Sequence, residues 1–103
     1  MLNDWKWEKI DNYKYVIRDN NNKIIIDLKQ IRNEQWICTL YNDEYEYELR
    51  QRAFFPENTT IEEIQWQVTI WISKQCNNIA NSFHYIRDHL PSAYDLFDKI
   101  TKL

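Results

Sequence analysis

Hydrophobic and polar side chains alternate through the first half of the chain, which is typical of β-strands. We expect four strands, over Tyr13–Arg18, Lys23–Ile31, Trp36–Tyr41 and Glu44–Arg50. The polar turns between them are short, and short turns between consecutive strands favour an antiparallel meander. Residues Trp5–Ile10 either begin the first strand or form a short element of their own.

The second half has helical periodicity instead. Hydrophobic residues recur at spacings of three and four from Ile61 to Leu90, which predicts one amphipathic helix of about 30 residues, roughly 45 Å long. Thr60, followed three residues later by Glu63, fits a capping box at the start of this helix. A helix of this length exceeds what four strands need, so a kink or break near Cys76–Asn78 is an alternative to a straight rod.

Pro91 ends the long helix, and Ser92 is placed to cap a short helix over the last residues. The predicted fold class is therefore α+β: a four-stranded antiparallel β-meander followed by a long amphipathic helix and a short C-terminal helix. With 103 residues and no linker or internal repeat, we expect a single domain spanning residues 1–103.

Composition excludes several classes of protein. Hydrophobic residues make up 44% of the chain and aromatic residues 16%, too many for a disordered protein. Glycine is absent, which excludes glycine-rich phosphate-binding loops and dinucleotide-binding motifs. We therefore expect Asn or Asp at any position whose backbone needs a positive φ angle. No apolar run approaches the roughly 20 residues of a membrane span, and the N-terminus lacks a signal peptide, so we expect a cytoplasmic protein.

Few residues in the sequence are candidates for catalysis or metal binding. Cys38 and Cys76 lack metal-like spacing and are expected to be small buried hydrophobic residues. His84 and Asp88 share a helical face, either as a base with its orienting carboxylate or as a surface pair, while His89 points elsewhere. With no nucleophile near them and no enzyme motif, we expect a protein that is not an enzyme and that needs no metal or cofactor.

The net charge of −3 is unevenly distributed. Residues 43–63 hold seven carboxylates against two arginines, a net charge of −5. If Glu44, Glu46 and Glu48 lie on one strand they share a face at about 6.6 Å spacing, close to the spacing of phosphates along a nucleic acid. Such a row would fit a basic groove on a partner. The alternative is a solvated outer face whose charge discourages edge pairing.

A second candidate surface lies on the long helix. Trp66 and Ile70 fall opposite its main hydrophobic face, and a C-terminal helix turning back at Pro91 is expected to stop short of them. Left uncovered, they would form a partner surface or the seam of a homodimer. The alternative is that the N-terminal segment, with Trp5 and Trp7, folds over them.

Asn, Lys, Ile and Tyr, whose codons are AT-rich, are abundant, which points to a low-GC genome. In size, charge, composition and the segment Asp43-Glu44-Tyr45-Glu46-Tyr47-Glu48, the chain resembles small inhibitor proteins of phages and mobile elements, in particular anti-CRISPR proteins. The resemblance implies an inhibitor that occupies a nucleic-acid channel of a host Cas effector without binding nucleic acid itself. It assigns no residue roles.

The expected function is therefore a non-enzymatic inhibitor that acts in the host cytoplasm on a nucleic-acid-handling complex such as a Cas nuclease. The alternative is a homo-oligomeric structural or assembly protein. The candidate partner-binding residues are Asp43, Glu44, Tyr45, Glu46, Tyr47, Glu48, Trp66 and Ile70.

Overall fold

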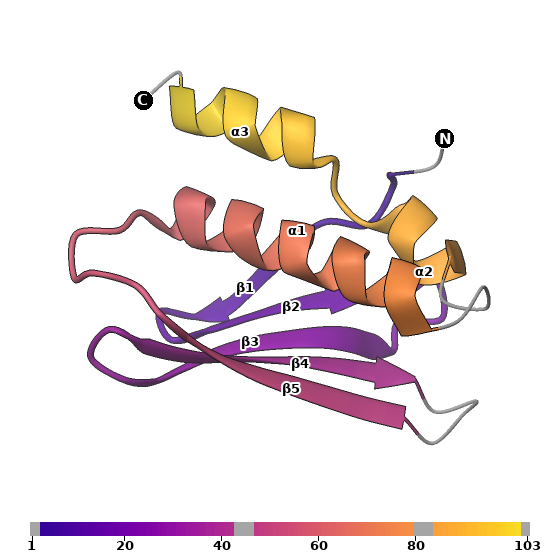
Figure 1. The fold of residues 1–103 in the computed structure, drawn as a ribbon, viewed down its shortest axis with the longest axis horizontal. Helices are drawn as coiled ribbons and strands as arrows, with labels where there is room; N and C mark the ends of the chain where they lie inside the picture. The colour runs from indigo at the N-terminus through magenta and orange to yellow at the C-terminus, as the bar shows by residue number, and fades with distance from the viewer. Residues whose placement is uncertain (1–2, 43–46, 80–83, 102–103) are drawn as a thin grey trace. The chain divides into compact units, whose positions relative to one another are not determined.

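The computed structural model describes residues 3–42, 47–79 and 84–101 (Figure 1). It contains strands β1 (Glu8–Asp11), β2 (Lys14–Arg18), β3 (Ile24–Arg32), β4 (Gln35–Asn42) and β5 (Tyr47–Phe54), and helices α1 (Ile61–Ile79), α2 (His84–His89) and α3 (Ala93–Thr101). The chain divides into two compact units, a sheet unit over Trp7–Asn58 and a helical unit that combines Met1–Lys6 with Thr59–Leu103. Each unit is described by itself.

The sheet unit is an antiparallel meander, as the alternation predicts. Its five strands lie in sequence order, so each one pairs with its neighbour along the chain (Figure 1). The expected count of four strands is wrong, because β1 pairs with β2 through Glu8 opposite Val16. All four residues of β1 are exposed, so the strand shows no buried alternation that a sequence pattern could detect.

One face of this sheet carries the large buried side chains. Ile17, Ile26 and Leu40 form a cross-strand row and are fully buried. A parallel row joins Tyr15, Leu28 and Cys38, and the Tyr15 ring lies 6.4 Å from that of Trp36. Cross-strand contacts of this kind stabilise a sheet and fix its register, since a one-residue slip would turn the whole set to the other face.

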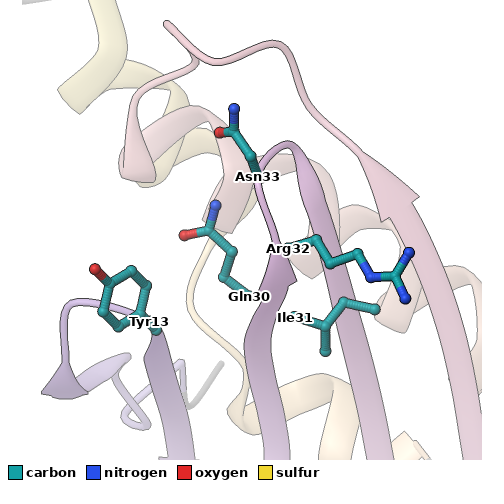
Figure 2. A pocket seen from close by; sticks show the side chains of 5 residues that line it. All are labelled: Tyr13, Gln30, Ile31, Arg32 and Asn33. Atoms are coloured by element: carbon teal, nitrogen blue, oxygen red, sulfur yellow. The ribbon is translucent and has the colours of Figure 1, made fainter.

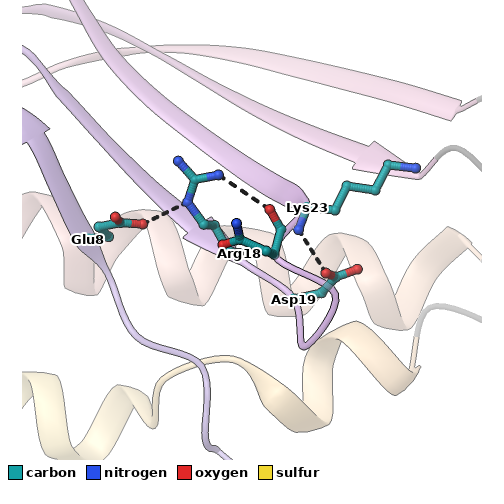
Figure 3. Close-up of polar contacts among 5 residues, drawn as sticks. Glu8, Arg18, Asp19 and Lys23 are labelled. Atoms are coloured by element: carbon teal, nitrogen blue, oxygen red, sulfur yellow. Dashed lines mark hydrogen bonds and ion pairs between the residues drawn. The ribbon is translucent and has the colours of Figure 1, made fainter.

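Side chains and polar backbone groups hold the β2–β3 turn without glycine. Asp19 Oδ1 accepts hydrogen bonds from the backbone N–H groups of Asn21 and Lys23, at 2.9 and 3.0 Å. Asn22 adopts a φ of 66°, as expected for Asn in a left-handed turn position. Beside the turn, Arg18 donates to Glu8 Oε2 at 2.8 Å, an ion pair that ties β2 to β1 (Figure 3).

The β3–β4 turn departs from the expectation that Asn or Asp serves every positive φ. Glu34 has a φ of 66°, in the region that disfavours most residues with a Cβ. Its carbonyl oxygen accepts a hydrogen bond from Phe55 N at 2.9 Å, and its Oε1 accepts from Glu57 N at 3.2 Å. These two bonds to the segment after β5 compensate for the unfavourable backbone angle.

The helical unit holds two described helices where one straight helix through Leu90 was predicted, and this agrees with the alternative of a break near Cys76–Asn78. α1 covers Ile61–Ile79 and α2 covers His84–His89, with residues 80–83 outside the described part of the chain. Arg87 Nη1 donates to Asn77 Oδ1 at 2.6 Å and so ties α2 to the end of α1.

Both expected caps are confirmed. Glu63 N donates to Thr60 Oγ1 at 3.3 Å at the start of α1, and Asp95 N donates to Ser92 Oγ at 3.4 Å at the start of α3. α3 returns alongside α1 in the opposite direction (Figure 1). The buried side chains of this unit include Ile64, Val68, Ile72 and Cys76 on α1, Ile86 on α2, Leu90, and Leu96 on α3.

Candidate functional site

The acidic segment 43–48 follows β4 in the sequence and overlaps the start of β5. Among the described residues, Asn42 pairs with Tyr47, and Glu48 lies in register opposite Tyr41. The expected strand positions of Asp43, Glu44, Tyr45 and Glu46 lie outside the described residues, as do the side chains of Tyr47 and Glu48. The row of carboxylates on one strand face therefore stays a prediction, and only the backbone of Tyr47 and Glu48, in β5, is described.

Strand β5 carries both signs of charge. Glu48, Arg50 and Arg52 occupy alternate positions of one strand, and alternate positions belong to one face. Among the described strands β5 pairs with β4 alone, so it forms an edge of the sheet. The face that was expected to present carboxylates therefore turns basic toward the far end of β5.

The second expected surface is covered in part by α3. The ring of Phe97 lies 5.3 Å from that of Trp66, and both Trp66 and Ile70 are only half-buried. The prediction that the C-terminal helix stops short of Trp66 is wrong. It assumed one straight helix to Leu90, whereas Arg87 on α2 donates to Asn77 on α1, a contact that one straight helix would not allow.

Of the two side chains considered for acid–base chemistry, His84 and Asp88, the structure describes only that of Asp88. Asp88 Oδ1 pairs with Arg87 Nη2 at 3.1 Å, and the side chain of His84 lies outside the described set. Within the described ranges, no group of three or more His, Cys, Asp or Glu residues is arranged to hold a metal ion.

Sequence reasoning missed a buried histidine in the helical unit. His89, of which the sequence indicated only that it points away from the face of His84 and Asp88, is 5% exposed, and its Nδ1 lies 2.5 Å from Asp4 Oδ1. The Trp5 ring stacks on the imidazole at a centroid distance of 4.6 Å, and the Tyr85 ring meets it edge-on at 4.5 Å. No sequence signal could have found this cluster, since 85 positions separate Asp4 from His89.

The backbone of residues 3–5, which we call the N-terminal strap, completes that cluster. Asn3 N donates to Asp88 O at 2.8 Å and Trp5 N donates to His89 O at 3.0 Å, so the strap caps carbonyl groups at the end of α2. The hydrogen bond from His89 lowers the pKa of the exposed Asp4 carboxyl below its ordinary value. The contact with His89 therefore favours the ionised carboxylate of Asp4, and we interpret the cluster as a structural anchor for the N-terminal strap.

The second feature that sequence reasoning missed is a hollow on the charged face of the sheet. It has a volume of about 250 Å³ and is lined by Lys14, Asp27, Lys29, Ile31, Ile37, Thr39, Tyr41 and Arg50. We call it the basic hollow, because three of its eight lining residues are cations and one is an anion. Its residues come from four strands, and only the register brings them together.

A neighbouring hollow of about 270 Å³ lies at the end of β3, lined by Tyr13, Gln30, Ile31, Arg32 and Asn33 (Figure 2). It shares Ile31 with the basic hollow. The Tyr13 side chain is 63% exposed, and Tyr13 O accepts a hydrogen bond from Gln30 N at 2.8 Å. An exposed ring with amide side chains beside it offers stacking and hydrogen-bonding groups, with no nucleophile among them.

Both cysteines are free thiols and both are buried, as expected. Burial raises the pKa of the Cys38 thiol well above its ordinary value and that of Cys76 to about 11. Nucleophilic chemistry needs a thiolate, so these two side chains are unsuited to it near neutral pH.

Across the described ranges, no helix is both long enough and apolar enough to cross a membrane. A comparison with protein-family models found no match to this chain, and comparisons with curated proteins and with solved structures likewise found none.

Proposed function

We propose that this chain is a non-enzymatic binding protein of a phage or mobile element that inhibits a nucleic-acid-handling protein of its host. A Cas nuclease, which holds nucleic acid in a positively charged channel, is the most concrete target. The inhibitor would act in the host cytoplasm and would contact the target protein, while binding no nucleic acid itself.

The observation that supports this proposal is the run of acidic residues between two paired strands of the sheet. Asn42 pairs with Tyr47 across β4 and β5, and the sequence from Asp43 to Glu48 holds four carboxylates. Among the described strands β5 pairs with β4 alone, so the acidic segment leads into an edge strand. Charge complementarity of this kind favours rapid association and selects among partners.

Reversing the charge of Glu44, Glu46 and Glu48 to Lys tests the proposal. Wild-type protein is used in pull-downs from lysate of a low-GC bacterium that expresses a Cas nuclease, followed by a cleavage assay with the captured enzyme. We expect the wild type to bind and inhibit the nuclease and the triple variant to do neither. If the triple variant still binds with wild-type affinity, the acidic segment is not the contact.

A charge-matched control separates local from general effects. Glu57, Asp95 and Asp98 are exposed acidic residues outside the acidic segment, and their change to Lys alters the net charge by the same amount. Asp95 lies in the first turn of α3, where its charge is stabilising, so a circular dichroism spectrum must confirm that the control folds. Equal loss of binding in both triple variants would indicate dependence on net charge and would refute a defined contact.

A homo-oligomeric structural protein is the second candidate function. Phe97 is 46% exposed although its ring lies against that of Trp66, and Tyr94 on the same helix is 80% exposed. Three rings gathered on one part of the helical unit form an apolar surface of the kind that subunits bury. Light scattering at high concentration tests this candidate: it predicts a dimer that Trp66→Ala dissociates, whereas a strict monomer excludes it.

A further inference from the structure

The two edges of the sheet, as the structure describes it, differ in length and regularity. β1, at one edge, has four residues, and its pairing with β2 is interrupted by a register shift between Lys9 and Asp11. Short and irregular edge strands discourage pairing with another chain. β5, at the other edge, has eight residues without proline or glycine, and it pairs with β4 in one register along its whole length (Figure 1). β5 therefore offers a long and regular edge to a further strand.

The outer side of β5 is open within the sheet unit. Among the described strands none but β4 pairs with β5, and an edge strand directs half of its backbone N–H and C=O groups outward. The chain that follows β5 turns toward the β3–β4 turn instead, where Phe55 N donates to Glu34 O. Arg50, Gln51 and Arg52 are exposed on β5.

The charges of β5 change sign along the strand. Glu48 lies near its start, and Arg50 and Arg52 follow at alternate positions, which belong to the same face. An antiparallel partner strand runs in the opposite direction. A second copy of β5 would therefore bring its positive later half against the negative start of the first copy. Such self-complementarity is what the interface of a two-fold dimer requires.

Symmetry and charge together select one register. In a two-fold antiparallel pair one residue lies opposite itself, and the buried faces of the two sheets then stay on the same side. Leu49 lies opposite the buried Leu40 and so belongs to that face. If Leu49 lies opposite itself, Glu48 of each copy faces Arg50 of the other. The two adjacent symmetric registers would instead oppose Glu48 to Glu48 or Arg50 to Arg50, and directly opposed like charges are destabilising.

We propose that two copies of this chain pair through β5, antiparallel and with Leu49 opposite Leu49, so that two five-stranded sheets become one. Addition of a strand at a sheet edge is a common mode of recognition. Arg50 already has a partner in its own chain, and its five N–H donors allow a carboxylate of the second copy to bind as well. A contact of one strand with another is smaller than the roughly 1,200 Å² of stable complexes, so the dimer should be weak and concentration-dependent.

This inference goes beyond the proposed function and does not rest on it. A host target that binds Glu48 would compete with the second copy, so the dimer is measured on the purified full chain alone. Failure of either proposal is thus visible without the other, since inhibition is assayed with a nuclease and pairing without one.

Sedimentation equilibrium of two charge-reversal variants tests the pairing. Glu48→Arg and Arg50→Glu each turn two attractive cross-strand pairs into repulsive ones, so each should weaken the dimer about tenfold or more. An equal mixture of the two variants restores both pairs across the interface, because one chain then holds two arginines and the other two glutamates. We expect the mixture to form a heterodimer with about the wild-type affinity, a rescue that a role within one chain would not produce.

Matched controls separate this contact from general attraction between charges. Glu57→Arg and Lys74→Glu make the same changes in charge at exposed positions outside β5. Each should dimerise as the wild type does, and their mixture should gain nothing. A mixture of Glu48→Arg with Arg52→Glu tests the register in which Arg50 opposes itself, and it should form no heterodimer. Circular dichroism spectra that match the wild type verify that each variant is folded.

Any of four results would overturn the proposal. The wild type stays monomeric at about 1 mM, where a dimer with a Kd of that size would hold half of the chains. The mixture of Glu48→Arg and Arg50→Glu, both folded, forms no heterodimer. Glu48→Arg pairs with Arg52→Glu instead, which would show a different register. Trp66→Ala dissociates the wild-type dimer, which would place the interface on the helical unit.

Discussion

Replacing Trp5 by Ala tests whether the N-terminal strap is an integral part of the helical unit. The Trp5 side chain is 4% exposed and contacts two rings, His89 at 4.6 Å and Tyr85 at 5.6 Å between centroids. Its backbone N–H, which donates to His89 O, is retained in the variant, so the substitution removes the packing of the indole and leaves that hydrogen bond possible.

The expected loss is large for a residue so near the end of the chain. Truncation of a buried Trp to Ala costs about 3–5 kcal/mol, through lost apolar burial and the cavity that remains. Domains of this size have unfolding free energies of about 5–15 kcal/mol, so the variant should lose a substantial fraction of its stability. At roughly 4–8 °C per kcal/mol, Tm should fall by about 12 °C or more.

Urea denaturation followed by far-UV circular dichroism measures this loss. Trp5→Phe retains a ring that can stack on His89 and should lie between the wild type and the Ala variant. Tyr94→Ala, at a position 80% exposed, is the control and should change the unfolding free energy by no more than about 0.5 kcal/mol. A loss below about 1 kcal/mol for Trp5→Ala, in the range of surface substitutions, would refute the view that the strap is packed as described.

Three further predictions concern ionisation and capping. Pairing with His89 lowers the pKa of the Asp4 carboxyl, so the ionised carboxylate stabilises the fold. This stabilisation is complete above the ordinary pKa of 3.8 and is lost as the pH falls through the lower pKa of the folded state. Asp4→Asn should therefore flatten the dependence of the urea midpoint on pH over that acid range. Cys38 and Cys76 should resist iodoacetamide at pH 8 in the native state and react quickly in urea, as mass spectrometry would show; rapid native labelling contradicts their burial. Thr60→Ala should lower the unfolding free energy by about 1 kcal/mol, because it removes the acceptor for Glu63 N; an unchanged urea midpoint argues against the cap.

Most of the fold could be predicted from local patterns in the sequence. Alternation predicted β2, β3 and β4 within one or two residues, and the hydroxyls of Thr60 and Ser92 marked the starts of α1 and α3. These signals are local, since a helix cap or an alternating strand is defined by residues a few positions apart in the sequence. β1 was left open because its four residues are exposed and owe their strand geometry to pairing with β2.

The functional features depend on contacts that no local pattern records. His89 acquires its environment from Asp4 and Trp5, at the other end of the chain. Lys14 and Arg50, 36 positions apart in the sequence, line one hollow only because the registers of β2 through β5 bring them to one face. Helical periodicity from Ile61 to Leu90 did not show that α2 folds back toward α1, nor that the Phe97 ring on α3 lies against that of Trp66.

The order of the strands and the position of the strap have a consequence for how the chain folds. Every strand of the meander pairs with its neighbour in sequence, so the sheet forms through short loops whose closure costs little entropy, and such low contact order favours rapid folding. The bonds from Asn3 and Trp5 to Asp88 and His89 instead close a loop of almost the whole chain. Docking of the strap should therefore be the last step of folding, and a chain still emerging from the ribosome cannot complete its helical unit until its C-terminal residues are made.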